Sequence, residues 1–234
     1  VSTNAQLTAF AADGVTNNPA ITAPNNAEAG AVVKYRVTKG TDAPGVWSTV
    51  YTAPVANGSA DGVYTVEVRQ TDKAGNVSTP QAITFTLDSS KPATPNATFT
   101  DSTNGLSTDS VGHNADGITN NAAVTAPANV EAGARVEYRV TKGTGTPSPW
   151  SSTYTAPPAN GTADGAYKVE VRQTDKAGNV SAVQTVNFTL DSTAPAVANA
   201  VLTTDSGIST NAITNSGAIT APTTTTNGGP IEVG

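Results

Sequence analysis

The sequence predicts an all-β chain built from tandem β-sandwich domains with Greek-key connections. Residues 64–69 and 167–172 alternate apolar and polar side chains, which is the pattern of a strand with one buried face. Turn-forming Asp, Gly and Asn residues follow each stretch and end the alternation. Asp13-Gly14 recurs as Asp116-Gly117, an offset of 103 residues. This period suits a sandwich domain and is too long for a solenoid repeat.

The repeat covers most of the chain. Residues 71–78, Thr-Asp-Lys-Ala-Gly-Asn-Val-Ser, return letter for letter at 174–181. We expect three domains: residues 1–91 form a first repeat without its opening strand, 92–194 a complete second repeat, and 195–234 the start of a third. The sequence is therefore interpreted as a window of a longer array.

Seven strands are expected in the second repeat, with a long loop from Asp101 to Asn121 after the first of them. They cover residues 96–100, 122–126, 134–141, about 150–152, about 154–156, 166–174 and 185–191. Strands of this length between frequent turn residues are typical of a Greek-key sandwich.

The longest hairpin carries two more specific expectations. Because strands 134–141 and 166–174 should be antiparallel neighbours, we expect Glu137 to face Arg172 and Arg139 to face Glu170 on the outward side. In the first repeat Lys34 replaces the first glutamate, so only one such pair, Arg36 with Glu67, should remain. Tyr64 and Tyr167 open equivalent strands after Asp-Gly and are expected to form tyrosine corners, with each hydroxyl bonded to the preceding turn.

Composition excludes several classes of function. The net charge of −6 argues against nucleic-acid binding, and the absence of cysteine excludes a disulfide-stapled scaffold. No stretch approaches the roughly 20 apolar residues of a membrane helix. We expect no enzymatic activity: His113 is the single histidine, and no nucleophile elbow, zinc pattern or phosphate loop is present.

One ordered set of motifs points to a family. Asp-Lys-Ala-Gly-Asn-Val-Ser at 72–78 and 175–181, then Leu-Asp-Ser-x-x-Pro, then Asp-Gly-x-Thr-Asn, resembles the bacterial immunoglobulin-like repeats of giant secreted adhesins and biofilm proteins. The resemblance implies a cell-surface stalk, often exported by a type I system and often stiffened by calcium near domain junctions. The third repeat departs from the pattern, because Asn211-Ala212-Ile213-Thr214-Asn215 replaces Asp-Gly-x-Thr-Asn.

Sandwich topology brings a candidate calcium site to the junction of the first two repeats. The linker should contact two loops of the second repeat, so that Asp88, Glu131 and Asp175 converge, with Asn179 or backbone carbonyls completing the shell. Calcium binds 6–8 oxygen ligands, and uncompensated carboxylates repel one another. The alternative is that these acidic residues only hydrogen-bond backbone groups in turns.

A second candidate calcium site lies in the long loop. It would combine Asp101, Asp109 and Asp116 with Asp164 from the neighbouring corner, since long aperiodic loops are often functional or ordered by a metal. The alternative is a plain turn rich in Asn, Ser and Gly.

Two functions remain open at this point. The first is a structural stalk module of an adhesin at the bacterial cell surface, outside the cell, whose partners are neighbouring repeats and, through a distal domain, a host or surface ligand. The second is a module that itself binds a glycan or protein. Trp47 and Trp150 are the aromatic candidates for such binding, although a core position is the preferred interpretation for both.

Overall fold

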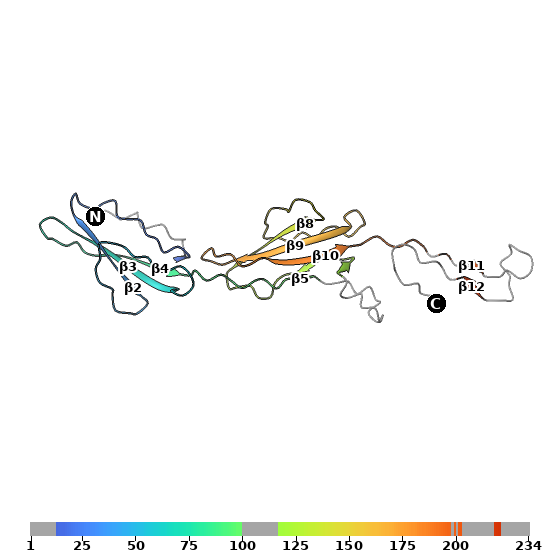
Figure 1. Cartoon of the computed structure of the whole chain (residues 1–234), viewed down its shortest axis with the longest axis horizontal. Coiled ribbons are helices and arrows are strands. Elements are labelled where there is room, and N and C mark those ends of the chain that lie inside the picture. Colours follow the sequence, from blue (N-terminus) through green and yellow to red (C-terminus); the bar gives the residue numbers. More distant parts are fainter. Residues whose placement is uncertain (1–12, 100–116, 198, 200, 203–217, 221–234) are drawn as a thin grey trace, which may run out of the picture.

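The computed structural model describes residues 13–99, 117–197, 199, 201–202 and 218–220. These residues form strands and connecting turns and no helix, which confirms the all-β prediction. Two four-stranded sheets follow one another along the long axis of the molecule and are joined by an extended linker (Figure 1).

The first sheet has the strand order β1-β4-β3-β2. Its strands are β1 Val15–Thr16, β2 Val32–Lys39, β3 Gly62–Thr71 and β4 Gln81–Leu87. The three long strands pair antiparallel, whereas β1 pairs parallel with β4.

The second sheet repeats this arrangement in the order β6-β10-β9-β8. Its strands are β6 Ile118–Thr119, β8 Arg135–Lys142, β9 Gly165–Thr174 and β10 Gln184–Leu190. Two short pairs complete the described strands: β5 Thr98–Phe99 with β7 Val124–Thr125, and β11 Val201–Leu202 with β12 Ile219–Thr220.

Three expected features of the second repeat differ from the structure. Of the strand expected at about residues 150–152, only Ser151 pairs, as an isolated bridge with Tyr138. Residues 118–119, expected within the long loop, form β6 and pair parallel with β10; a two-residue strand is too short to show alternation. Residues 154–156, expected as a strand, are not one. Tyr154 instead donates its hydroxyl to the carbonyl of Ala122 at 2.5 Å, and burial raises its pKa to about 12.

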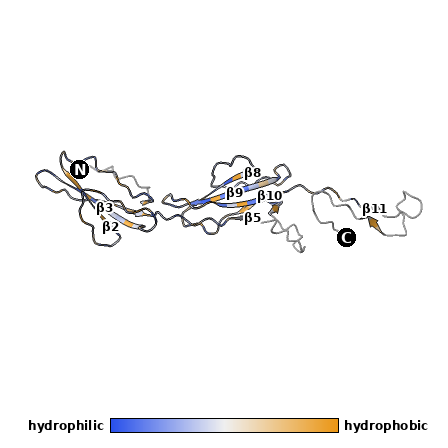
Figure 2. Ribbon diagram, viewed as in Figure 1, coloured by the Kyte–Doolittle hydropathy of each residue, from blue (hydrophilic) through white to orange (hydrophobic). Residues whose placement is uncertain are grey.

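Alternation builds the core of each unit, and Figure 2 shows apolar and polar positions alternating along the strands. In the second sheet Val169 and Val171 are fully buried, with Phe188 and Leu190 from β10 beside them. The β5–β7 pair forms the opposing layer, where Phe99 meets Phe188 with ring centroids 5.7 Å apart. Burial of such side chains contributes about 1.5–3 kcal/mol each.

The tyrosine corners are confirmed. Tyr64 and Tyr167 are buried, and their hydroxyls donate 2.6 Å hydrogen bonds to the carbonyls of Ala60 and Ala163. Gly62 and Gly165, which lie between each carbonyl and its tyrosine, adopt φ values of 141° and 138°, which favour glycine.

The predicted cross-strand ion pairs are also confirmed. Arg139 donates to Glu170 through Nε at 2.8 Å and Nη2 at 2.9 Å, and Arg172 Nε donates to Glu137 at 3.0 Å. In the first repeat Arg36 pairs with Glu67 in the same way.

The expectation that the tryptophans lie in the core is wrong. Ser151 bridges the core-facing Tyr138, so its neighbour Trp150 points to the opposite, outward face. There the guanidinium groups of Arg139 and Arg172 stand 4.7 and 4.2 Å from its ring centroid. Trp47 has the same relation to two arginines of the first repeat.

Candidate metal centre at the domain junction

Three turns hold the carboxylates of the candidate junction site. Asp88 follows the buried end of β4, and its N–H donates to the carbonyl of Thr16 at 2.9 Å. Asp175 follows β9 and begins a tight turn in which Gly178 adopts a φ of 92°. Glu131 precedes β8, and its carbonyl accepts the N–H of Ala134 at 2.9 Å. The ends of β4 and β9 and the start of β8 therefore set the positions of the three turns.

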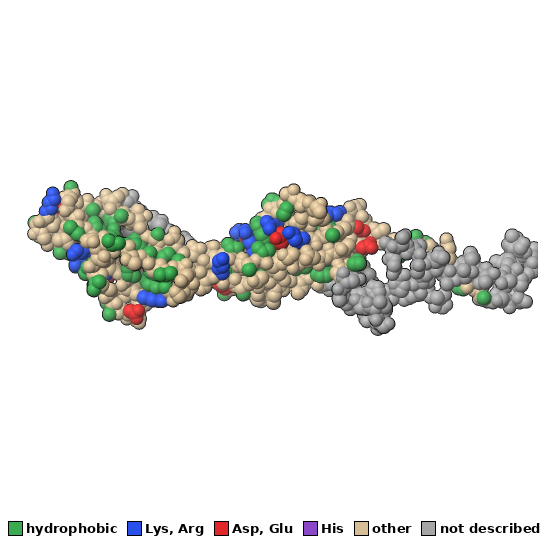
Figure 3. All heavy atoms as spheres, in the orientation of Figure 1, with side chains coloured by type: hydrophobic (Ala, Val, Ile, Leu, Met, Phe, Trp, Pro, Cys, Tyr) green, Lys and Arg blue, Asp and Glu red, His purple; other side chains and the backbone are tan. Residues whose placement is uncertain are grey.

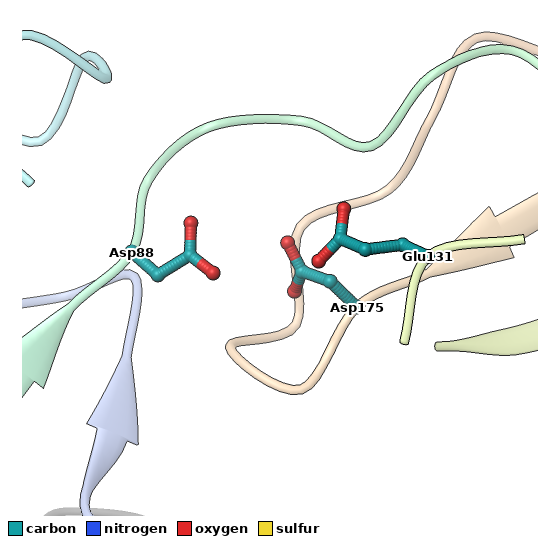
Figure 4. Close-up of side chains that lie close together, drawn as sticks. All are labelled: Asp88, Glu131 and Asp175. Carbon is teal, nitrogen blue, oxygen red and sulfur yellow. The ribbon is translucent and has the colours of Figure 1, made fainter. Parts of the chain in front are cut away.

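The three carboxylates converge. Asp88, Glu131 and Asp175 each offer an oxygen, and these oxygens lie within 4.8 Å of one another. Asp175 is only 7% exposed, Asp88 is partly buried, and Glu131 is exposed. Figure 4 shows the three side chains pointing toward a common space from the linker and from two loops of the second repeat. The sandwich topology therefore brings together residues that lie at least 43 positions apart in sequence.

Asn179 joins the turn after β9 to the linker through hydrogen bonds. Its Nδ2 donates to the Asp88 carbonyl and to Asp175 Oδ2, both at 2.8 Å, and its backbone N–H donates to Asp175 Oδ1. Asn76 and Asp72 form the same turn in the first repeat. A role of Asn179 as a metal ligand stays a prediction.

The cluster makes ionisation of Asp88 unfavourable. Burial, and next the charge of Asp175, raise the pKa of Asp88 above its ordinary value. In the first repeat the side-chain hydrogen bond from Asn76 instead lowers the pKa of Asp72. The hydrogen bonds of the turn thus stabilise a carboxylate, whereas the approach of the linker places the charge of Asp88 beside that of Asp175.

Asp61, which sequence reasoning missed, holds the linker on the side of the first repeat. It accepts four hydrogen bonds of 2.6–3.1 Å from the N–H and hydroxyl groups of Ser89 and Ser90. Burial opposes ionisation of Asp61, but these hydrogen bonds together lower its pKa. Asp61-Gly62 at the start of β3 could have revealed the role of Asp61, because the same pair recurs as Asp164-Gly165 in the second repeat.

Gln173, also missed, holds the linker on the other side. It is fully buried; its Nε2 donates to the carbonyl of Ala93 at 2.7 Å and its Oε1 accepts the N–H of Glu131 at 2.9 Å. Gln173 shares the core-facing parity of Val169 and Val171, so a polar residue at this position was a detectable signal.

The second predicted calcium site is only partly within the described residues. Asp101, Asp109 and Asp116 lie outside them. Asp164 occupies the place of Asp61 in the second repeat and accepts hydrogen bonds from Ser192 and Thr193, which lower its pKa. Its role as a metal ligand stays a prediction.

The repeated sandwich with its tyrosine corner matches one known family. The profile of the bacterial Ig-like domain matches residues 3–89 and 97–192, which is most of the chain. The chain belongs to the bacterial Ig-like domain family. Among curated proteins no match to the chain was found.

Bacterial Ig-like domains are modules of bacterial surface proteins and are typically structural rather than enzymatic. The described residues include no helix long and apolar enough to cross a membrane. Among the described residues, the groups that converge at the junction of these two Ig-like domains are carboxylates, which are oxygen ligands of the kind that hard cations bind.

Proposed function

We propose that these Ig-like domains are a stalk segment of a bacterial cell-surface adhesin and that calcium stiffens the junction between them. The observation that carries the proposal is the convergence of Asp88 from the linker with Glu131 and Asp175 from the second domain. An ion held by all three would connect the two domains directly. Support of cell adhesion or of a biofilm, outside the cell, is the function that such a stalk would serve.

The residues present fit calcium. Carboxylates are hard oxygen ligands, and three of them offer enough charge to replace part of the hydration shell of the ion. After burial, the charge of Asp175 contributes to the raised pKa of Asp88, so the two carboxylates repel each other. When bound, calcium would offset this repulsion and fix the distance between the linker and the two loops.

The proposed site responds to the difference in calcium concentration between the cytosol and the outside of the cell. Extracellular calcium modules typically bind with Kd values of about 10⁻⁴–10⁻³ M, so such a site fills outside the cell and empties in the cytosol. A stalk that is flexible before export and stiff afterwards would hold a distal domain away from the surface.

Isothermal titration calorimetry tests the proposal. We expect the chain to bind calcium with a dissociation constant in the range of about 10⁻⁴–10⁻³ M, and Asp88→Ala to remove the binding that is due to the junction. Asp191→Ala is the matched control, because Asp191 has the equivalent position after β10 and is exposed. Equal calcium binding by the wild type and Asp88→Ala would contradict the proposal.

The tryptophans do not favour the alternative of a glycan-binding module. Two guanidinium groups stand over each ring, at 4.0–4.7 Å from its centroid, and so occupy aromatic surface that a sugar ring would need for stacking.

A further inference from the structure

The side chain of Lys176 lies across the turn that carries Glu131. A Cβ atom placed on Gly133 would overlap Cε of Lys176 and lie 3.1 Å from its Nζ, so the end of the lysine stem rests on this glycine. Lys176 directly follows Asp175, and Gly133 comes two residues after Glu131. One side chain therefore connects the two turns of the second domain that supply carboxylates to the junction (Figure 4).

The turn at Gly133 is built to receive this stem. Its φ of 84° lies in the left-handed region that favours glycine, and any side chain there would occupy the space of the lysine. The N–H of Ala134 closes the turn on the carbonyl of Glu131 at 2.9 Å, and Gln173 accepts the N–H of Glu131. Gln173 thus holds the start of the turn, and Lys176 covers its end with methylene groups, as lysine stems do on exposed surfaces.

The first domain contains the same contact. A Cβ atom on Gly30 would overlap Cε of Lys73 and lie 2.9 Å from its Nζ, and Ala31 closes the turn of Glu28 at 2.9 Å. The linker that carries Asp88 leaves the first domain after β4 and approaches the turns of the second domain. The contact therefore belongs to the domain itself and forms without this linker.

We propose that Lys176 is a positioning residue, whose stem holds the turn of Glu131 beside that of Asp175 and so presents the Glu131 carboxylate to the junction. Glu131 is exposed, whereas Asp88 is partly buried and Asp175 is buried, so Glu131 has the most freedom to lose when an ion binds. Ordering its turn in advance lowers the entropic cost of binding. The effect on calcium rests on the proposed function, but the contact between the two turns does not.

Two substitutions separate the stem of Lys176 from its charge. Lys176→Met keeps an unbranched stem and removes the charge, whereas Lys176→Ala removes both. A difference between these two variants therefore reports the stem alone. Figure 3 shows other basic side chains gathered over β8 and β9, and both variants leave these in place.

Hydrogen exchange of the Ala134 amide, measured by NMR on the whole chain in EDTA, tests the contact without calcium. We expect this amide to exchange faster in Lys176→Ala than in Lys176→Met by about twofold or more, because the turn opens locally more often. Lys176→Met should match the wild type. The Ala31 amide of the first domain is the internal control and should change only in Lys73→Ala. Equal exchange of Ala134 in Lys176→Ala and Lys176→Met would overturn the proposal.

Calcium titration of the same variants tests the positioning role. Lys176→Ala should bind calcium about two- to tenfold more weakly than Lys176→Met, the range expected when the ion must order one more side chain. Lys73→Ala is the matched control and should keep the wild-type affinity. Equal affinities of Lys176→Ala and Lys176→Met would overturn the positioning role. Absence of calcium binding by the wild type would contradict the stalk proposal instead, and the exchange of Ala134 would then decide whether Lys176 holds the turn.

Discussion

The side-chain amide of Asn179 donates a 2.8 Å hydrogen bond to the backbone carbonyl of Asp88, 91 residues earlier. This contact joins the turn after β9 to the linker that leaves β4, so it crosses the domain boundary. Asp61 and Gln173 hold the two ends of the same linker. Hydrogen bonds therefore define where the linker lies, and the carboxylate cluster forms around that path.

Asn179→Ala should loosen the junction more than it weakens the turn. Loss of each hydrogen bond costs about 0.5–1.5 kcal/mol, and Asn76→Ala is the control because Asn76 makes the equivalent turn contacts in the first domain. Both variants should lower the melting temperature slightly. Only Asn179→Ala should broaden the length distribution measured by small-angle scattering. Identical distributions for Asn179→Ala and Asn76→Ala would show that the hydrogen bond from Asn179 to Asp88 does not stiffen the junction.

Asp88→Asn should have opposite effects with and without calcium. The pKa of Asp88 is raised in the folded chain, first by burial and then by Asp175. Stability from this group is therefore present at low pH and is lost as the pH rises through the raised pKa. In EDTA at pH 7 we expect Asp88→Asn to melt at a higher temperature than the wild type, and in millimolar calcium at a lower one.

Asp191→Asn is the control for these two opposite shifts in melting temperature and should show neither of them. A melting temperature of Asp88→Asn that stays on one side of the wild-type value under both conditions would contradict the electrostatic account of the junction.

Tyr167→Phe should lower the free energy of unfolding by about 0.5–1.5 kcal/mol, the net value of one hydrogen bond. The hydroxyl bonds the carbonyl of Ala163 while the ring stacks on Phe188, and the substitution removes only the former. Urea unfolding of both Tyr167→Phe and Tyr64→Phe measures this loss. A change near zero in both would mean that water replaces the tyrosine hydroxyl at no cost.

Glu170→Gln should flatten the acid limb of the stability curve. The hydrogen bond from Arg139 is the largest cause that lowers the pKa of Glu170. The pair therefore stabilises the fold above the unfolded pKa of about 4.3, and this stability is lost as the pH falls through the lower folded pKa. Urea unfolding between pH 2 and 7, about the range over which carboxylates titrate, should show a shallower slope for Glu170→Gln; a slope equal to that of the wild type would contradict the assignment.

The alternation of apolar and polar residues predicts most of the fold. Period-two alternation predicts the long hairpins and their register, down to the pairing of Arg139 with Glu170, because one face of each strand must be buried. It does not predict β6, since two residues carry no period. The core position expected for Trp150 is also wrong, because its neighbour Ser151 bridges the core-facing Tyr138.

The candidate site was predictable in part, for a different physical reason. Topology alone places the loops of Asp88, Glu131 and Asp175 at one end of the second domain. The residues that position them, Asp61 and Gln173, are polar groups whose partners are backbone atoms and serine hydroxyls far away in sequence. Such partners follow from three-dimensional packing, and composition or spacing does not reveal them.

Small-angle scattering of the chain with saturating calcium and with EDTA tests the central claim most directly. If calcium stiffens the junction, calcium should narrow the distribution of particle lengths and increase the maximum dimension, and Asp88→Ala in calcium should resemble the wild type in EDTA. Superimposable wild-type profiles in calcium and in EDTA would contradict the claim and leave a spacer whose junction is held by hydrogen bonds alone.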